Sequence, residues 1–274
     1  MNVLYGALMV AGATALAVAA MLFVRRRAPE GSFFSDGDRA SGVFGVLATG
    51  FSVLLGLIVF LAFSSYDQAR TGAETEALLV SQQLETAQLL PEPAGAELSG
   101  ELVCYARSVA GVQWQRMENG TIGEDLNPWA VKLAQTLQTV DPQTPSEQAA
   151  YGKWLDERSD REQARSDRIH GAVGVIPLPL WLVLLFTAGV IFVFILFFAD
   201  SAERAVVQAL LMGSVVAVMV STLLLLQFLN NPFHPGLGGL RPVAMERAEK
   251  IIDQELAAAG RTIQVPCDAA GNPV

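Results

Sequence analysis

The sequence predicts an all-α integral membrane protein with four transmembrane helices and a helical insert between the second and the third. Of its 274 residues, 52% are hydrophobic and only 16% are charged, whereas soluble globular domains carry roughly 25% charged residues. The mean hydropathy is +0.39. The apolar residues concentrate in four uncharged blocks of at least ~20 residues, the length that a helix needs to cross a bilayer. These blocks are 3–24, 42–64, 178–199 and 205–229.

The blocks divide the chain into four parts. Residues 1–64 hold the first two spans and a short basic loop, and residues 65–176 form an extramembrane insert. Residues 177–230 hold the third and fourth spans, and residues 231–274 form an extramembrane tail. A cleaved secretory signal is the alternative for the first block, but its basic cluster follows the apolar run, whereas a signal peptide begins with basic residues.

Basic residues predict the orientation. Arg25, Arg26 and Arg27 follow the first span and Arg39 precedes the second. Short loops rich in arginine stay in the cytoplasm. The insert and the C-terminal tail are therefore expected on the extracytoplasmic side of a bacterial plasma membrane.

The insert is acidic and helical. Residues 65–176 contain nine basic and seventeen acidic residues, a net charge of −8. Prolines and apolar periodicity predict a helical bundle with helices at 65–90, 94–117, 127–140 and 146–170.

One heptad pattern runs from the second span into the insert without an intervening proline. Such a pattern predicts a single long helix that leaves the membrane and pairs with the next helix in a hairpin. Its positions are Gly42, Gly45, Thr49, Ser52, Gly56, Val59, Phe63, Tyr66, Arg70, Ala73, Ala77, Val80, Leu84 and Ala87.

The last insert helix contains the charged run DERSDREQARSDR. Glu157 and Arg161 are four residues apart, as are Arg158 and Glu162, so these charges can pair along one helix. The expected structure is a solvated, self-paired helix. The alternative is a ring of charge at the mouth of an oligomeric pathway.

The sequence contains no catalytic motif and no cluster of metal-ligand residues at a recognised spacing. It lacks HExxH, CxxC and GxSxG, and its glycine-rich run at 236–239 lacks the lysine of a phosphate-binding loop. We therefore expect no enzymatic activity, no cofactor, no metal and no nucleic-acid partner. The spans also lack the ionisable residues that proton-coupled transporters use.

One face of the second span is small or weakly polar, with Gly45, Thr49, Ser52 and Gly56. Small residues of this kind allow helices to pack closely in a membrane. The functional alternative is that this face lines a narrow pore in a ring of subunits.

The sequence resembles the bacterial bestrophin-like membrane proteins over nearly its whole length. The resemblance rests on the order of two spans, helical insert and two spans, and on the stretches 42–47 (GVFGVL), 63–70 (FSSYDQAR), 90–93 (LPEP) and 231–233 (NPF). It implies a terminal helix, here at 242–259. Bestrophins are pentameric anion channels with a cytosolic insert, so the resemblance implies a pore lined by the second span, whereas the arginines here predict an external insert.

The leading functional hypothesis is therefore an oligomeric passive ion channel in the lipid bilayer. Thr49, Ser52 and Gly56 are the pore-lining candidates and Phe63 is the candidate constriction. Asp67 and Arg70 are expected at the outer mouth, where the acidic insert would concentrate cations. The alternative is a non-conducting accessory, structural or sensor subunit that binds partners through its insert.

The chain has two cysteines, Cys104 in the insert and Cys267 in the tail. Under the arginine-based orientation both lie on the oxidising side, which predicts a single structural disulfide. Two unrelated buried thiols are the alternative, and a cytosolic insert would favour them.

Overall fold

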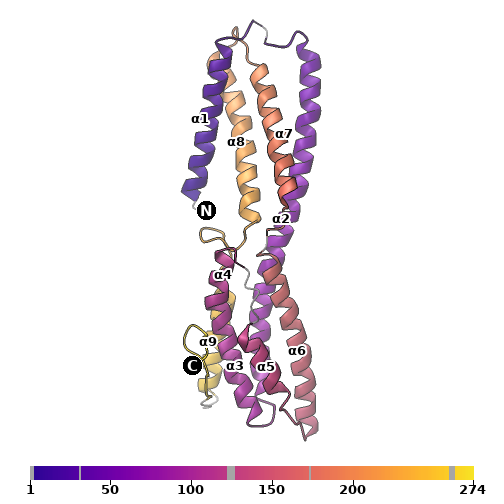
Figure 1. The fold of residues 1–274 in the computed structure, drawn as a ribbon, viewed down its shortest axis with the longest axis vertical. Helices are drawn as coiled ribbons and strands as arrows, with labels where there is room; N and C mark the ends of the chain where they lie inside the picture. Colours follow the sequence, from indigo (N-terminus) through magenta and orange to yellow (C-terminus); the bar gives the residue numbers. More distant parts are fainter. Residues whose placement is uncertain (1–2, 31, 122–126, 173, 259–262) are drawn as a thin grey trace. The chain divides into compact units, whose positions relative to one another are not determined.

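The computed structural model describes residues 3–30, 32–121, 127–172, 174–258 and 263–274, and the regular elements within these ranges are helices. It forms two compact units, Met1–Ser65 with Gly174–Asn230, and Tyr66–Val173 with Asn231–Val274. Figure 1 shows the helices of both units. The predicted all-helical class is confirmed.

Four helices among the described residues are long and apolar enough to cross a membrane. They are α1 (Val3–Arg25), α2 (Gly37–Ala87), α7 (Leu178–Phe197) and α8 (Ala205–Leu229). Each exceeds or matches the ~20 residues that a bilayer requires. The four predicted apolar blocks thus lie in helices, except that the block 178–199 extends two residues beyond α7.

In the first unit, α1 packs along α8 (Figure 1). A Cβ atom on Gly213 of α8 would lie 3.3 Å from Thr14 Cγ2 and 3.5 Å from Val18 Cγ2 of α1. Ala17 and Met21 of α1 are buried. A glycine in α8 therefore lets the two helices approach closely, as small residues do between helices in membranes.

Polar and aromatic contacts join the helices at one end of this unit. The guanidinium group of Arg25 donates hydrogen bonds to the backbone oxygens of Asp200, Ser201 and Glu203. These bonds join the end of α1 to the segment before α8. At the same end, the ring of Phe198 lies 5.9 Å from that of Phe44 in α2.

The second span and the start of the insert form one helix, as the heptad pattern predicted. Helix α2 has 51 residues without interruption. In the second unit, the pattern residues Ala77, Val80, Leu84 and Ala87 are buried in the core. The pattern therefore changes from small residues in the span to packed apolar residues in the insert.

Over the residues that the structure describes, the second unit is a helical bundle built from the rest of α2 and from six further segments. These are α3 (Ala94–Ser108), a π-helical turn (Val109–Gln113), α4 (Trp114–Glu118), α5 (Pro128–Leu137), α6 (Pro145–His170) and α9 (Val243–Ala258). The predicted helix at 94–117 is thus divided by the π-helical turn. The end of the predicted terminal helix, residue 259, lies outside the described residues.

Local sequence signals explain where α5 and α6 begin. The Asn127 side chain accepts a hydrogen bond from the Trp129 N–H, and Pro128 takes the first helical position. Thr144 and Glu147 form a reciprocal capping box before α6. Such caps satisfy backbone N–H groups that have no partner within the helix.

The tail packs against α3 and α5. Gly271 has φ +81°, and a Cβ atom there would overlap the backbone of Ser108. The indole Nε1 of Trp129 donates a hydrogen bond of 2.6 Å to the Gly271 oxygen. Glycine is required at this position by both the positive φ and the close approach.

The expectation of a solvated α6 is wrong for three of its charged residues. Glu157, Arg161 and Arg168 are buried, with Arg161 and Arg168 each 1% exposed. Together with Ala150, Trp154 and Ala164 they form the inward stripe of α6. Arg158 and Glu162 do pair on the exposed side, at 2.9 Å.

Candidate functional site

The four residues predicted to line a pore are all exposed on α2. Thr49 and Phe63 are exposed on α2, and Phe63 retains 53% of its surface. Ser52 and Gly56 are exposed as well, and they also border a cavity formed with two other apolar helices. The predicted set thus lies on an uncovered surface of α2, and two of its members also adjoin a recess of the same unit.

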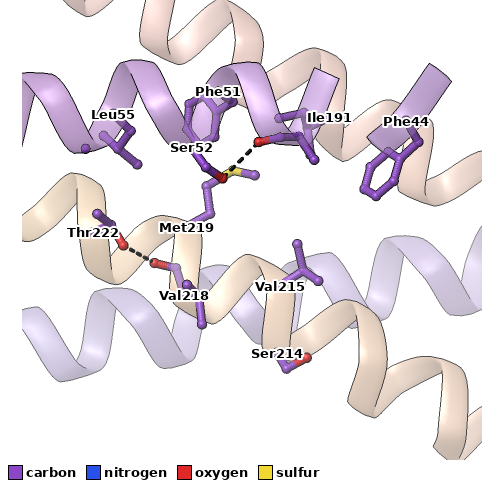
Figure 2. Close-up of a pocket in the computed structure, with 12 residues that line it drawn as sticks. Phe44, Phe51, Ser52, Leu55, Ile191, Ser214, Val215, Val218, Met219 and Thr222 are labelled. Carbon is purple, nitrogen blue, oxygen red and sulfur yellow. Dashed lines mark hydrogen bonds between the residues drawn. The ribbon is translucent and has the colours of Figure 1, made fainter. Parts of the chain in front are cut away.

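This cavity lies between α2, α7 and α8 and has a volume of about 470 Å³. Figure 2 shows apolar side chains from the three helices surrounding it. Its lining consists of Phe44, Ala48, Phe51, Ser52, Leu55 and Gly56 of α2, Ile191 of α7, and Ser214, Val215, Val218, Met219 and Thr222 of α8.

Three hydroxyl groups in the cavity lining donate to their own helices. Ser52 Oγ donates to the Ala48 oxygen, Ser214 Oγ to the Leu211 oxygen and Thr222 Oγ1 to the Val218 oxygen, each at 2.8 Å. Two of these bonds are drawn in Figure 2. Because the hydroxyl hydrogens are already engaged, the cavity presents a largely apolar surface.

The two residues predicted at the outer mouth, Asp67 and Arg70, are both exposed at the start of the second unit. Arg70 Nε pairs with Glu74 Oε1 at 3.1 Å. The Glu74 carboxylate raises the pKa of Arg70, first through this hydrogen bond and then through its charge. Both mouth candidates remain accessible to ions in solution.

Sequence analysis missed a buried ionic cluster between α2, α3 and α6. Arg168 Nε lies 2.5 Å from Glu76 Oε2, and Arg168 Nη2 lies 3.1 Å from Glu76 Oε1. Tyr105 Oη donates to Glu76 Oε1 at 2.5 Å. Burial, followed by the charge of Glu76, raises the pKa of Tyr105 well above its usual range, so the phenol keeps its proton.

Arg161 extends this cluster. Its guanidinium carbon lies 4.5 Å from the centre of the Tyr105 ring, within the range of a cation–π contact. Burial lowers the pKa of Arg161, while the nearby Tyr105 and Glu76 act in the opposite direction. Two arginines and one glutamate thus meet around a single tyrosine.

The sequence positions of the buried residues on α6 indicate this cluster. Residues 150, 154, 157, 161, 164 and 168 alternate steps of four and three, the spacing of a core-facing stripe. Charged residues at half of these positions concealed the stripe from a search for apolar periodicity. The acidic partner at position 76 lies on another helix, 92 residues away along the chain.

The structure joins Cys104 on α3 to Cys267 in the tail by a disulfide, with the Cα atoms 5.7 Å apart. Around it, Arg107 Nη1 donates to the Asp268 oxygen at 3.4 Å. Backbone N–H groups of Asn272, Ala270 and Gly271, together with the Asn272 side chain, lower the pKa of Asp268. Among the described residues, no cluster of three or more His, Cys, Asp or Glu side chains could hold a metal ion.

Comparisons with known proteins agree with this architecture. The sequence profile of the Bestrophin-like domain matches residues 11–238. A crystal structure of a bacterial bestrophin homologue from Klebsiella pneumoniae superposes with a TM-score of 0.66 at 13% identity, over 89% of this chain and 98% of that chain. A crystal structure described only as a membrane protein gives 0.67 at 13% identity, over 92% and 99%. No curated protein sequence matches the chain.

Proposed function

The chain belongs to the bestrophin-like family, and we propose that it is an oligomeric membrane protein that conducts ions passively, with α2 lining the pore. The predicted membership in this family is confirmed by the profile match. Pore lining, conduction and subunit arrangement are our proposal. They rest on the exposed small-residue face of α2.

The supporting observation is an uncovered, small-residue face on a transmembrane helix. Thr49 is exposed there, and Cβ atoms built on Gly42 and Gly45 would meet nothing within 4 Å. These glycines therefore do not serve close packing within the chain. In an oligomer, such a face can pack against neighbouring copies or surround a pore.

Within this proposal, Thr49 is a pore-facing hydroxyl and Phe63 is the hydrophobic constriction. Ser52 and Gly56 lie at the edge of the same face but also line the cavity with α7 and α8, so they are secondary candidates. Asp67 and Arg70 would stand at the outer mouth. The net charge of −8 over residues 65–176 favours cations near the insert.

We further propose that the insert and the tail are extracytoplasmic. The arginines at positions 25, 26, 27 and 39 favour a cytoplasmic location for the loop that carries them. The Cys104–Cys267 pair is consistent with this orientation, because structural disulfides persist in oxidising compartments.

Ion flux from liposomes tests conduction directly. The purified chain, confirmed as a folded oligomer, should release a trapped ion, and Phe63→Ala should change the size or selectivity of that flux. Leu61→Ala is the matched control, because Leu61 is 49% exposed and lies about 160° around the α-helix from Phe63. Absence of flux under every salt, voltage and pH tested would reject the channel.

The second candidate function is a non-conducting accessory or sensor subunit. Apolar side chains exposed on the insert favour it, with Leu78 57% and Leu155 42% exposed. Exposed apolar side chains of this kind can take part in contacts with a partner protein. Folded oligomers that pass no ions, but whose insert captures a defined envelope protein, would support this function.

A further inference from the structure

The cavity between α2, α7 and α8 has the chemistry of a hydrocarbon site. Its lining comes from three apolar spans, and the hydroxyls of Ser52, Ser214 and Thr222 each donate to a carbonyl of their own helix. An ion or a polar ligand would find few groups here to replace its hydration shell. An apolar chain needs no such partners.

The length of the cavity fits one leaflet of a bilayer. Along α2 the lining extends from Phe44 to Gly56, which corresponds to about 18 Å at ~1.5 Å per residue. Half of a hydrocarbon core of ~30 Å is about 15 Å. A neighbouring transmembrane helix would cross both leaflets, whereas one acyl chain occupies one.

Basic residues lie at the end of the unit where the cavity begins. Phe44 lines the cavity and its ring contacts Phe198, just after α7. Arg39, near the start of α2, and Arg204, the residue before α8, are both exposed. Arginines at a membrane surface attract anionic lipid head groups.

We propose that this cavity holds one acyl chain of an anionic phospholipid whose head group lies near Arg39 and Arg204. The apolar lining favours an acyl chain over a polar ligand. The length of the recess matches an acyl chain within one leaflet, and the arginines favour a negatively charged head group. The site adjoins the exposed face of α2 that carries Thr49, because Ser52 and Gly56 lie at the edge of that face, but lipid binding does not depend on ion conduction.

Lipid retention by the full-length protein tests the proposal. The detergent-purified chain would be stripped of lipid, incubated with phosphatidylglycerol or with phosphatidylcholine of the same acyl chains, and analysed by native mass spectrometry. We expect one phosphatidylglycerol per chain and at least fivefold weaker retention of phosphatidylcholine. Equal retention of the two lipids would overturn the assignment of an anionic head group.

Two glycines of α2 supply a matched pair of variants. Gly56 lines the cavity and Gly50 does not, yet a Cβ atom at either position would meet nothing within 4 Å. Gly56→Leu should therefore fill part of the recess and weaken lipid retention at least fivefold, while Gly50→Leu should retain lipid as the parent does. Unchanged retention in Gly56→Leu would overturn the site.

Photolabelling of the unaltered protein tests the site without relying on the folding of a variant. Phosphatidylglycerol with a photoreactive group in its acyl chain should label peptides from the cavity lining, including Ser52 and Val218. Labelling spread evenly over exposed positions such as Val46 and Leu57 would reject a defined site. A second copy covering the cavity would instead appear as protein–protein crosslinks at these lining residues without bound lipid, which also rejects it.

Discussion

The guanidinium group of Arg168 on α6 donates two parallel hydrogen bonds to the carboxylate of Glu76 on α2. Both side chains are buried, with 1% and 0% of their surface exposed. Burial alone would lower the pKa of Arg168, but the charge and hydrogen bond of Glu76 raise it, so the guanidinium group keeps its charge in the core. A buried ion pair of this kind couples two helices, because neither partner can be removed without leaving the other uncompensated.

Removing one partner should therefore destabilise the bundle strongly. We expect Arg168→Met to lower the free energy of unfolding by about 3–5 kcal/mol, measured by denaturation of the full chain in detergent. Arg158→Met is the control, because Arg158 pairs with Glu162 on the exposed side of the same helix, where such pairs contribute about 0–1 kcal/mol. Equal losses in the two variants would contradict the special role of the buried pair. Replacing both Glu76 and Arg168 by apolar residues should recover much of the loss.

The close approach of α2 and α6 depends on Gly72. A Cβ atom there would lie 2.6 Å from the Arg168 nitrogen and 2.8 Å from the Ala164 oxygen. Since these are backbone atoms, Gly72→Ala should force the helices apart and lower the midpoint of thermal unfolding. Gly152→Ala in α6 meets nothing within 4 Å and should stabilise its helix by about 0.5–1 kcal/mol. A tolerated Gly72→Ala would show that the two backbones are farther apart than described.

The stability of the insert should depend on the charge of Glu101. Burial raises the pKa of this carboxyl group, while its hydrogen bond from Thr136 and the charge of Lys132 act in the opposite direction. A carboxyl pKa raised by folding adds stability below the unfolded pKa of ~4.3, and that contribution is lost as the pH rises through the folded pKa. Glu101→Gln should therefore raise the unfolding midpoint at pH 7 and change it little at pH 4. Glu85→Gln on the exposed side of α2 provides the control, and a midpoint for Glu101→Gln that is unchanged at both pH values would refute the prediction.

The Cys104–Cys267 bond should stabilise the folded protein by constraining a long loop. The two residues are separated by 163 positions, and closing a loop of this length contributes on the order of 4–5 kcal/mol in the chain-entropy model. Cys104→Ser, Cys267→Ser and the double variant should all lose a similar amount, because each removes the same bond. Alkylation of the membrane-extracted parent before reduction should label neither thiol. Two labelled thiols would contradict both the bond and the extracytoplasmic location of the insert.

Apolar periodicity was enough to predict the helices but not the cluster that joins them. The four long apolar helices and the continuation of α2 to Ala87 follow from apolar patterns that depend on local sequence alone. The core of α6 does not, because Glu157, Arg161 and Arg168 occupy inward positions that sequence rules normally assign to apolar residues. Their burial depends on Glu76 and Tyr105, which other helices supply, so only the assembled bundle shows it.

The same limit applies to the cavity. The weakly polar face of α2 could be identified from its own sequence, and it suggested that Ser52 and Gly56 share a role with Thr49. The structure adds that Ser52 and Gly56 also border a cavity, whose lining Val215, Val218 and Met219 of α8 complete. Pairing between helices far apart in the sequence is not encoded in the periodicity of either one.

The hydrogen bond from Trp129 to Gly271 makes an intrinsic fluorophore sensitive to the position of the tail. The indole is fully buried, and its Nε1 hydrogen is engaged by the tail's own backbone. Detachment of the tail would expose the ring to water and shift its emission to longer wavelengths. The chain has only four tryptophans, so reduction of the neighbouring disulfide can be followed optically, in intact membranes and without an added dye.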